Sequence, residues 1–224
     1  MKKTNMAAVI LAVLLLAVMT AGCARSSGSE FDPVQSSVFI KQDGSILSAT
    51  VEHTQQDYYT EENLKSFVEG KVSEFNAAQG KESAAYNKEG AERLPVAIVS
   101  CSLGAGQGEQ ILKYVLEYSS SDMLFAFTGT IRDAEMTLTS LATDSVESRL
   151  SKGDLVGEPF VDAKGQSVES SKITSQSKLR VVVSEGPATI QTEGKVVYMT
   201  QGCTLQDAYT VTTPGEGISY IVFK

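Results

Sequence analysis

The residues that could perform catalytic or metal chemistry are few and widely spaced. His53 is the only histidine among the 224 residues, so a general base or a zinc site would depend on a single imidazole. The three cysteines, Cys23, Cys101 and Cys203, lack the close spacing of paired zinc ligands. We therefore expect no metal ion and no cofactor, and we expect His53 to be a surface or partly buried side chain.

Acidic residues outnumber basic ones, 27 to 19, which gives a formal net charge of −8. Two groups of acids could form a carboxylate pair or bind Ca²⁺ if folding brought them together: Asp57, Glu61 and Glu62, and Asp154, Glu158 and Asp162. The sequence does not show that these acids are close in space, and a solvated acidic surface is the simpler interpretation. Phosphate binding requires clustered Lys and Arg, so this balance argues against nucleic acid as a partner.

Motifs of common enzyme classes are incomplete in this chain. Ser175 and Lys178 have the S-x-x-K spacing of penicillin-recognising enzymes, but the supporting motifs of those enzymes are missing. The glycine-rich stretch 104–108 continues with Glu109, where a dinucleotide-binding loop would have its third glycine. We therefore predict no catalytic residues and a protein that is not an enzyme.

The chain also has few of the large aromatic side chains on which sugars usually stack. The chain contains no tryptophan, which weakens a carbohydrate-binding interpretation. Tyr58, Tyr59 and Tyr86 could replace it, although tyrosine is equally common at the edge of a strand or helix.

The N-terminus has the three-part plan of a secretory signal peptide. Lys2 and Lys3 precede an uncharged, apolar run over residues 6–19, and small residues follow up to Gly22. As a helix, residues 6–21 would reach about 24 Å, short of the roughly 30 Å hydrocarbon core of a bilayer. The pattern therefore predicts a signal peptide over residues 1–22.

The ending Ala21-Gly22-Cys23 resembles the lipobox of bacterial lipoproteins, with Thr20 where that motif usually has Leu. The resemblance implies cleavage between Gly22 and Cys23 and a diacylglyceryl group on the Cys23 thiol. Two acyl chains give lasting membrane attachment, whereas one gives only marginal binding. A plain secretory peptide and an uncleaved anchor are the alternatives. We expect a lipid-anchored protein on the extracytoplasmic face of the cell membrane.

Lipidation of Cys23 would leave two cysteines. Cys101 and Cys203 could form one disulfide in an exported protein. The alternative is a buried thiol at Cys101 and a thiol beside a turn at Cys203.

The rest of the chain divides into a tether and one predicted domain. Residues 23–33 are mostly small and polar and should form a flexible tether, and residues 34–224 should form a single domain. Asp43-Gly44 between two strand-like runs predicts a hairpin. Thr60 can cap a helix whose apolar face is formed by Leu64, Phe67, Val68, Val72 and Phe75.

The second half reads as short strands between turns. We therefore predict an α+β class, in which a mainly antiparallel β-sheet carries one long amphipathic helix over about 60–79 and one or two short helices packed on it. The short helices are expected after Ser121 and after Thr130.

Three segments, 59–64, 127–134 and 194–198, look like small lipoproteins of Gram-positive gut anaerobes. That resemblance supports the location of the protein and implies no activity or site residues.

The leading hypothesis is a membrane-anchored, non-enzymatic interaction or accessory module of the cell envelope, with an envelope protein as a possible partner. The alternatives are a small solute-binding lipoprotein and an envelope hydrolase that uses carboxylates and His53.

Overall fold

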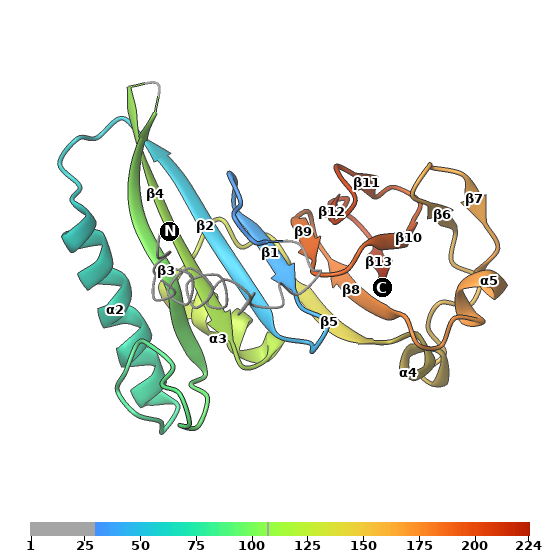
Figure 1. Ribbon diagram of the computed structural model, residues 1–224, viewed down its shortest axis with the longest axis horizontal. Coiled ribbons are helices and arrows are strands. Elements are labelled where there is room, and N and C mark those ends of the chain that lie inside the picture. Colours follow the sequence, from blue (N-terminus) through green and yellow to red (C-terminus); the bar gives the residue numbers. More distant parts are fainter. Residues whose placement is uncertain (1–29, 107) are drawn as a thin grey trace, which may run out of the picture.

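The computed structural model describes residues 30–106 and 108–224. About 37% of these residues lie in strands and 21% in helices, and the strands form two sheets along the length of the molecule (Figure 1). The predicted signal peptide, the cleavage site at Gly22 and the lipidation site at Cys23 lie outside the described residues. In the part of the chain that is described, no helix has the length and apolar character needed to cross a bilayer.

Sheet A combines strands from both halves of the chain in the order β11-β12-β9-β1-β2-β4-β3. Its strands are β1 (Ser37–Ile40), β2 (Ile46–Thr54), β3 (Val96–Gly106), β4 (Glu109–Tyr118), β9 (Thr189–Thr192), β11 (Thr204–Leu205) and β12 (Thr210–Thr212). β1 pairs with β9 in parallel, and the other neighbours are antiparallel. The predicted hairpin at Asp43-Gly44 joins β1 to β2, and Gly44 has the positive φ of +88° that its turn needs.

Sheet B is antiparallel throughout, in the order β5-β8-β13-β10-β6-β7. Its strands are β5 (Ser140–Ser145), β6 (Phe160–Asp162), β7 (Ser167–Val168), β8 (Arg180–Glu185), β10 (Val196–Thr200) and β13 (Ile218–Phe223).

The described residues contain four helices, of which only two are longer than six residues. They are α2 (Glu61–Ala78), α3 (Ser121–Ile131), α4 (Val146–Ser151) and α5 (Ser170–Thr174). Thr60 caps α2 as expected, since its Oγ1 accepts a hydrogen bond of 3.1 Å from the Asn63 N–H. The helix predicted after Thr130 is instead the last turn of α3 followed by turns.

The predicted α+β class is wrong, because the protein is mostly β and has two sheets. The expectation of a long amphipathic helix is also wrong. α2 buries only a narrow line of side chains, and Phe67, which was expected on its apolar face, is 61% exposed. The strand pattern explains the error. Residues 219–223 of β13 are all buried, because both faces of sheet B are covered, and such a run does not show how many sheets there are.

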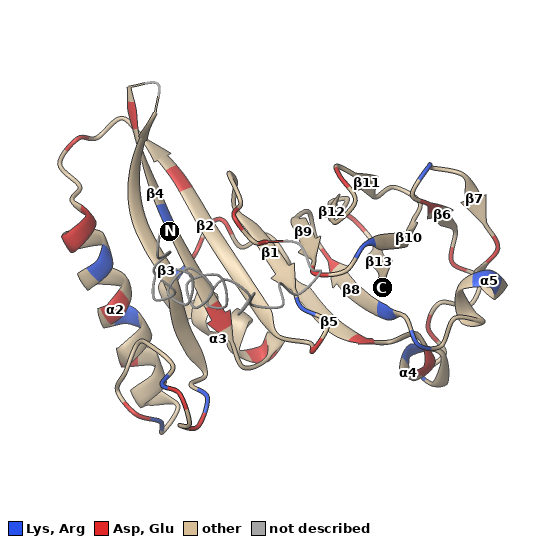
Figure 2. Cartoon of the chain, in the orientation of Figure 1, with Lys and Arg blue, Asp and Glu red and all other residues tan. Residues whose placement is uncertain are grey.

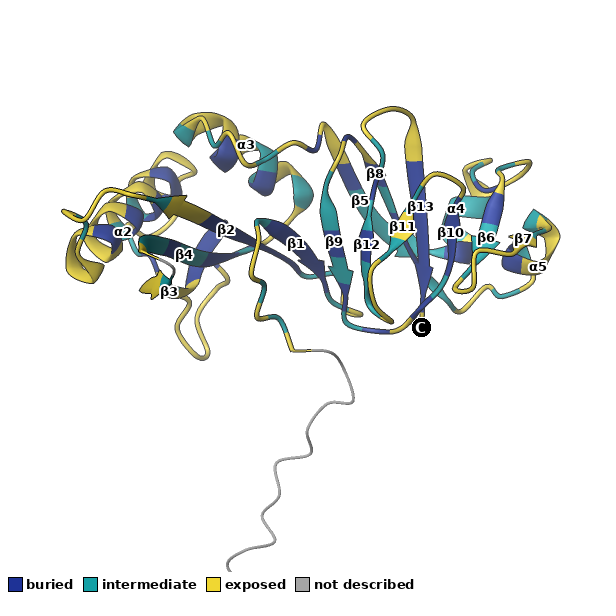
Figure 3. Ribbon diagram, turned by 90° about the horizontal axis from the view of Figure 1, so that it is seen from above, coloured by how far each residue is buried: buried dark blue, intermediate teal, exposed yellow. Residues whose placement is uncertain are grey.

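Successive side chains along the strands of sheet B point to opposite faces of the sheet, and each face contributes to a separate hydrophobic core. Val182 and Ile221 join the main core with residues of sheet A, α2 and α3. Val181 and Val222 point the other way, into a second core that includes Val146 of α4. The main core therefore connects the two sheets, and the helical elements α4 and α5 cover the far side of sheet B (Figure 3).

The two faces of sheet A have different coverings. Its inner face, which carries Tyr114 and Tyr118, packs against α2 and α3. On the outer face, Phe31 stacks on Phe39 with 5.0 Å between ring centroids, and Asp32 pairs with Lys113. The described start of the chain thus leaves from the side of sheet A opposite to α2 and α3 (Figure 3).

Candidate binding groove

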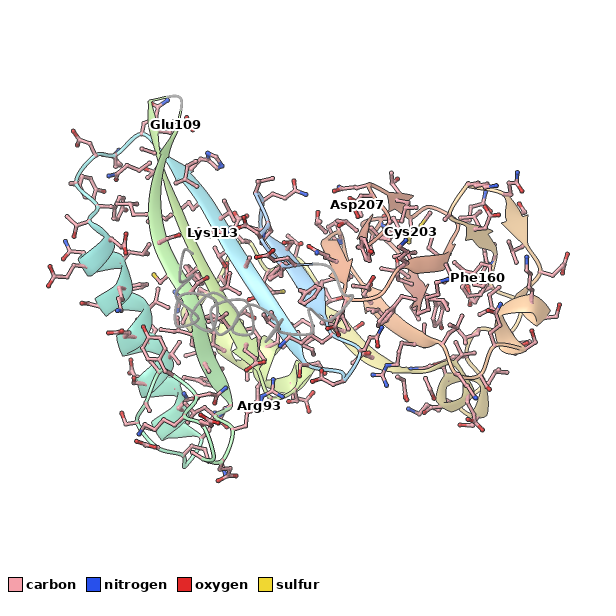
Figure 4. All side chains as sticks on the ribbon, viewed as in Figure 1. Arg93, Glu109, Lys113, Phe160, Cys203 and Asp207 are labelled. Carbon is pink, nitrogen blue, oxygen red and sulfur yellow. The ribbon has the colours of Figure 1, made fainter. Side chains whose placement is uncertain are left out.

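The sequence-predicted cysteine pair is not brought together. Cys101 lies in β3, at the edge of sheet A, and Cys203 lies between β10 and β11 in the other half of the molecule (Figure 4). Both thiols are free, so the possible disulfide is not formed. Cys203 makes a 3.6 Å contact with Thr200 Oγ1 beside a turn, which is the alternative stated for it.

His53, Asp154 and Asp162 make contacts at the surface. His53 Nδ1 lies 3.5 Å from Glu109 Oε2 at the end of the β3–β4 hairpin, and it is half exposed. Asp154 pairs with Arg149, and Asp162 accepts backbone N–H groups in a turn. Within residues 30–106 and 108–224 no three His, Cys, Asp or Glu side chains gather as metal ligands. Acidic residues are instead spread over both halves of the chain (Figure 2).

A groove of about 530 Å³, which we call the aromatic groove, lies on the inner face of sheet A and could take a ligand. Its floor comes from β2 and β4, one wall from the first turns of α2, and its end from the loop that joins β2 to α2. The lining residues are Glu52, Tyr58, Tyr59, Asn63, Leu64, Phe67, Leu112 and Tyr114. This volume lies within the range of roughly 300–1,000 Å³ found for small-molecule sites.

Local folding explains how the groove is formed. β2 ends at Thr54, and the chain must cross the sheet to reach the N-terminus of α2 at Glu61. Gln110 Nε2 of β4 donates a 3.1 Å hydrogen bond to the Tyr59 carbonyl oxygen and so holds this loop over the sheet. The rings of Tyr58 and Tyr59 then lie 4.6 Å apart, tilted by 38°.

The groove exposes an unusual amount of aromatic surface. Phe67 and Tyr58 are 61% and 64% exposed, whereas Leu64 and Leu112 below them are buried. Large aromatic side chains that stay exposed beside a hollow gain their burial energy when a ligand covers them. The arrangement is therefore suited to binding by apolar contact and ring stacking.

Two tyrosines of the groove, Tyr59 and Tyr114, have raised pKa values. Burial, with the nearby Asp133 carboxylate, raises the pKa of Tyr114 to about 12. Hydrogen bonding to the neighbouring Tyr58 raises the pKa of Tyr59. A phenol with a raised pKa donates a hydrogen bond and does not act as a base at pH 7.

Part of this groove is predictable from the sequence. Tyr58 and Tyr59, which the sequence offers as aromatic platform residues, both line it. Tyr86, considered with them, instead donates a 2.7 Å hydrogen bond to Glu69. Phe67 is predicted on the apolar face of its helix, and no sequence motif marks Tyr114 of β4 as a groove residue. A signal for Phe67 exists in its position, because a helix that buries Leu64, Val68 and Val72 turns residue 67 toward its flank.

Comparison with protein-family models, with curated proteins and with solved structures finds no match for this chain.

Proposed function

We propose that the protein is a membrane-anchored, extracytoplasmic lipoprotein that works as a non-enzymatic binding module of the cell envelope and binds its ligand in the aromatic groove. The observation that carries the binding role is the groove itself, with exposed Tyr58 and Phe67 above a buried apolar floor. Its lining supplies contact and stacking surface. Its ligand-sized volume favours the solute-binding alternative over a folded protein domain as the occupant.

The position of the chain start supports the anchored orientation. Glu30 lies on the outer face of sheet A, where its carbonyl accepts a hydrogen bond from Gln191. Cys23 and Glu30 are seven positions apart in the sequence, so a lipid on Cys23 would lie within about 25 Å of that face. The groove opens on the opposite, inner face and would remain accessible from outside the membrane.

Anchoring is tested by comparing the wild-type protein with Cys23→Ser. We expect the wild type in the membrane fraction, with an intact mass that matches a chain beginning at Cys23 plus a diacylglyceryl group. The Cys23→Ser protein should lose both the added mass and the cleavage before residue 23. Anchoring is contradicted if the wild type carries no lipid mass.

Binding is tested on the mature protein by native mass spectrometry after gentle extraction. Wild type should retain a bound species that the Tyr58→Ser/Phe67→Ser variant loses. Both side chains are exposed, so this change should leave folding intact. Val156→Ser is the matched control, because Val156 is 67% exposed but lies in the loop before β6. Equal occupancy in all three proteins would show that the ligand does not bind in the aromatic groove.

A further inference from the structure

The charges around the aromatic groove are unbalanced. Glu52 is the only charged side chain in the lining, and no Lys or Arg lines the groove. Glu52 has no ion-pair or hydrogen-bond partner for its side chain among the described residues, whereas Glu109 and Glu117 are both paired with basic groups. An unpaired carboxylate therefore faces a hollow lined with aromatic rings.

A second carboxylate lies behind the floor. Asp133 accepts a hydrogen bond from Thr50 Oγ1 at 3.3 Å, and Thr50 is the direct partner of Tyr114 in the β2–β4 ladder. Asp133 and Glu52 both raise the pKa of Tyr114, and Glu52 also raises that of Tyr59. The negative potential of these two carboxylates would attract a cation.

One aromatic ring of the groove already has a cation next to it. Lys71 Nζ lies 5.9 Å from the centroid of the Phe67 ring, within the distance at which a ring face attracts an ammonium group. Lys71 also lies 3.8 Å from Glu74 and does not line the groove. Tyr58, Tyr59 and Tyr114 have no such cation against their rings among the residues that the structure describes.

We propose that the groove selects a small organic cation, an ammonium group carried on an apolar body. The ammonium group would lie against the tyrosine rings beside Glu52, and the apolar body would cover Leu64 and Leu112. Aromatic faces beside a carboxylate are the usual receptor for quaternary and tertiary ammonium groups. The inference rests on the proposed binding function and adds the charge of the ligand.

Three probes of the same shape test the charge directly. Choline carries a cationic trimethylammonium head, whereas 3,3-dimethylbutan-1-ol and 3,3-dimethylbutanoate carry a neutral tert-butyl head of the same shape. The three molecules are therefore cationic, neutral and anionic overall. Each gives one nine-proton resonance, so ligand-observed saturation-transfer NMR can follow all three on the mature protein in neutral detergent. Signal that persists with Tyr58→Ser/Phe67→Ser is subtracted as binding outside the groove.

We expect choline to bind more tightly than the neutral alcohol, and the carboxylate to bind least. Glu52→Gln should weaken choline binding about two- to fivefold, as expected for an exposed charge pair, and leave the alcohol unchanged. Glu216→Gln removes the same charge from a distant exposed loop and should change neither.

Equal binding of choline and the alcohol, preference for the carboxylate, or no binding of any probe would each overturn the cation inference. These results would leave the proposed function standing as long as the native protein retains a bound species that depends on Tyr58 and Phe67. Loss of that dependence would instead contradict the proposed function.

Discussion

Asn76 is the polar residue on which the packing of α2 depends most. It is fully buried, its Nδ2 donates 2.8 Å hydrogen bonds to the carbonyls of Ala84 and Val96, and its Oδ1 accepts one of 3.1 Å from the Val96 N–H. These bonds satisfy backbone groups of Ala84, in the loop after α2, and of Val96, at the start of the edge strand β3. The side chain therefore joins the end of α2 to sheet A.

Asn76→Ala should lower the free energy of unfolding by roughly 3 kcal/mol, because it leaves several buried backbone groups without partners. Urea unfolding followed by circular dichroism measures this change. Asn63→Ala, an exposed position on the same helix, should change stability by less than about 0.5 kcal/mol. Equal effects of the two changes would show that the Asn76 contacts carry little energy.

Asp133 gives stability a dependence on pH. Burial raises its pKa above the usual 3.8, so the folded state holds this proton more tightly than the unfolded state. Its contribution to stability is therefore largest below pH 3.8 and is lost as pH rises through the folded-state pKa. Asp133→Asn should remove that loss, so that the variant gains stability relative to wild type between pH 4 and pH 7 in denaturant titrations.

Asp144 provides the control of opposite sign. Its hydrogen bond to Lys152 lowers its pKa to about 2. The stability that it contributes is present above pH 3.8 and is lost as pH falls toward 2. Asp144→Asn should therefore lower stability at pH 7 and have little effect at pH 2. If both variants changed stability in the same direction with pH, the assigned causes would be wrong.

At the scale of elements, the turn between β8 and β9 requires glycine at residue 186. Its φ is +101°, and a Cβ there would lie 2.5 Å from the Thr137 carbonyl oxygen. Gly186→Ala should cost roughly 2 kcal/mol. Gly70→Ala in α2 is the matched change, since nothing lies within 4 Å, and it should stabilise by up to about 1 kcal/mol. Thermal unfolding of both variants would show opposite shifts in Tm.

Elements set by local chemistry could be predicted from the sequence. The Thr60 cap and the Asp43-Gly44 turn act within a few residues, and both occur where expected. The sheets could not be predicted, because β1 pairs with β9 through Val38 and Ile190, which are 152 positions apart. No local pattern specifies that pairing, and it decides which strands belong to sheet A.

The aromatic groove was predictable only in part for the same reason. Tyr58 and Tyr59 stand out as adjacent aromatic residues in a polar loop. Their meeting with Tyr114 depends on the register of β2 against β4, in which Thr50 is opposite Tyr114 and Glu52 is opposite Leu112. The floor of the groove therefore becomes visible only once that register is known.

At the scale of the whole molecule, the shared core should make the two sheets unfold together. Val38 and Ile190 of sheet A belong to the same buried cluster as Val182 and Ile221 of sheet B. Cys101 lies in β3 of sheet A, and Cys203 directly follows β10 of sheet B, so the two thiols report on regions at opposite ends of the shared core. In a Cys23→Ser background, thiol labelling against urea should give the same midpoint for both. Separate midpoints would show two independent units.

If the proposed function is correct, a ligand occupies the aromatic groove in the living cell. The most direct measurement places a photocrosslinking phenylalanine derivative at position 67, with the same residue at position 156 as control, and compares adduct masses after irradiation of living cells. We expect a discrete adduct at position 67, its added mass that of a small molecule, and none at position 156. Equal crosslinking at the two positions, or none at either, would contradict binding of a ligand in the aromatic groove.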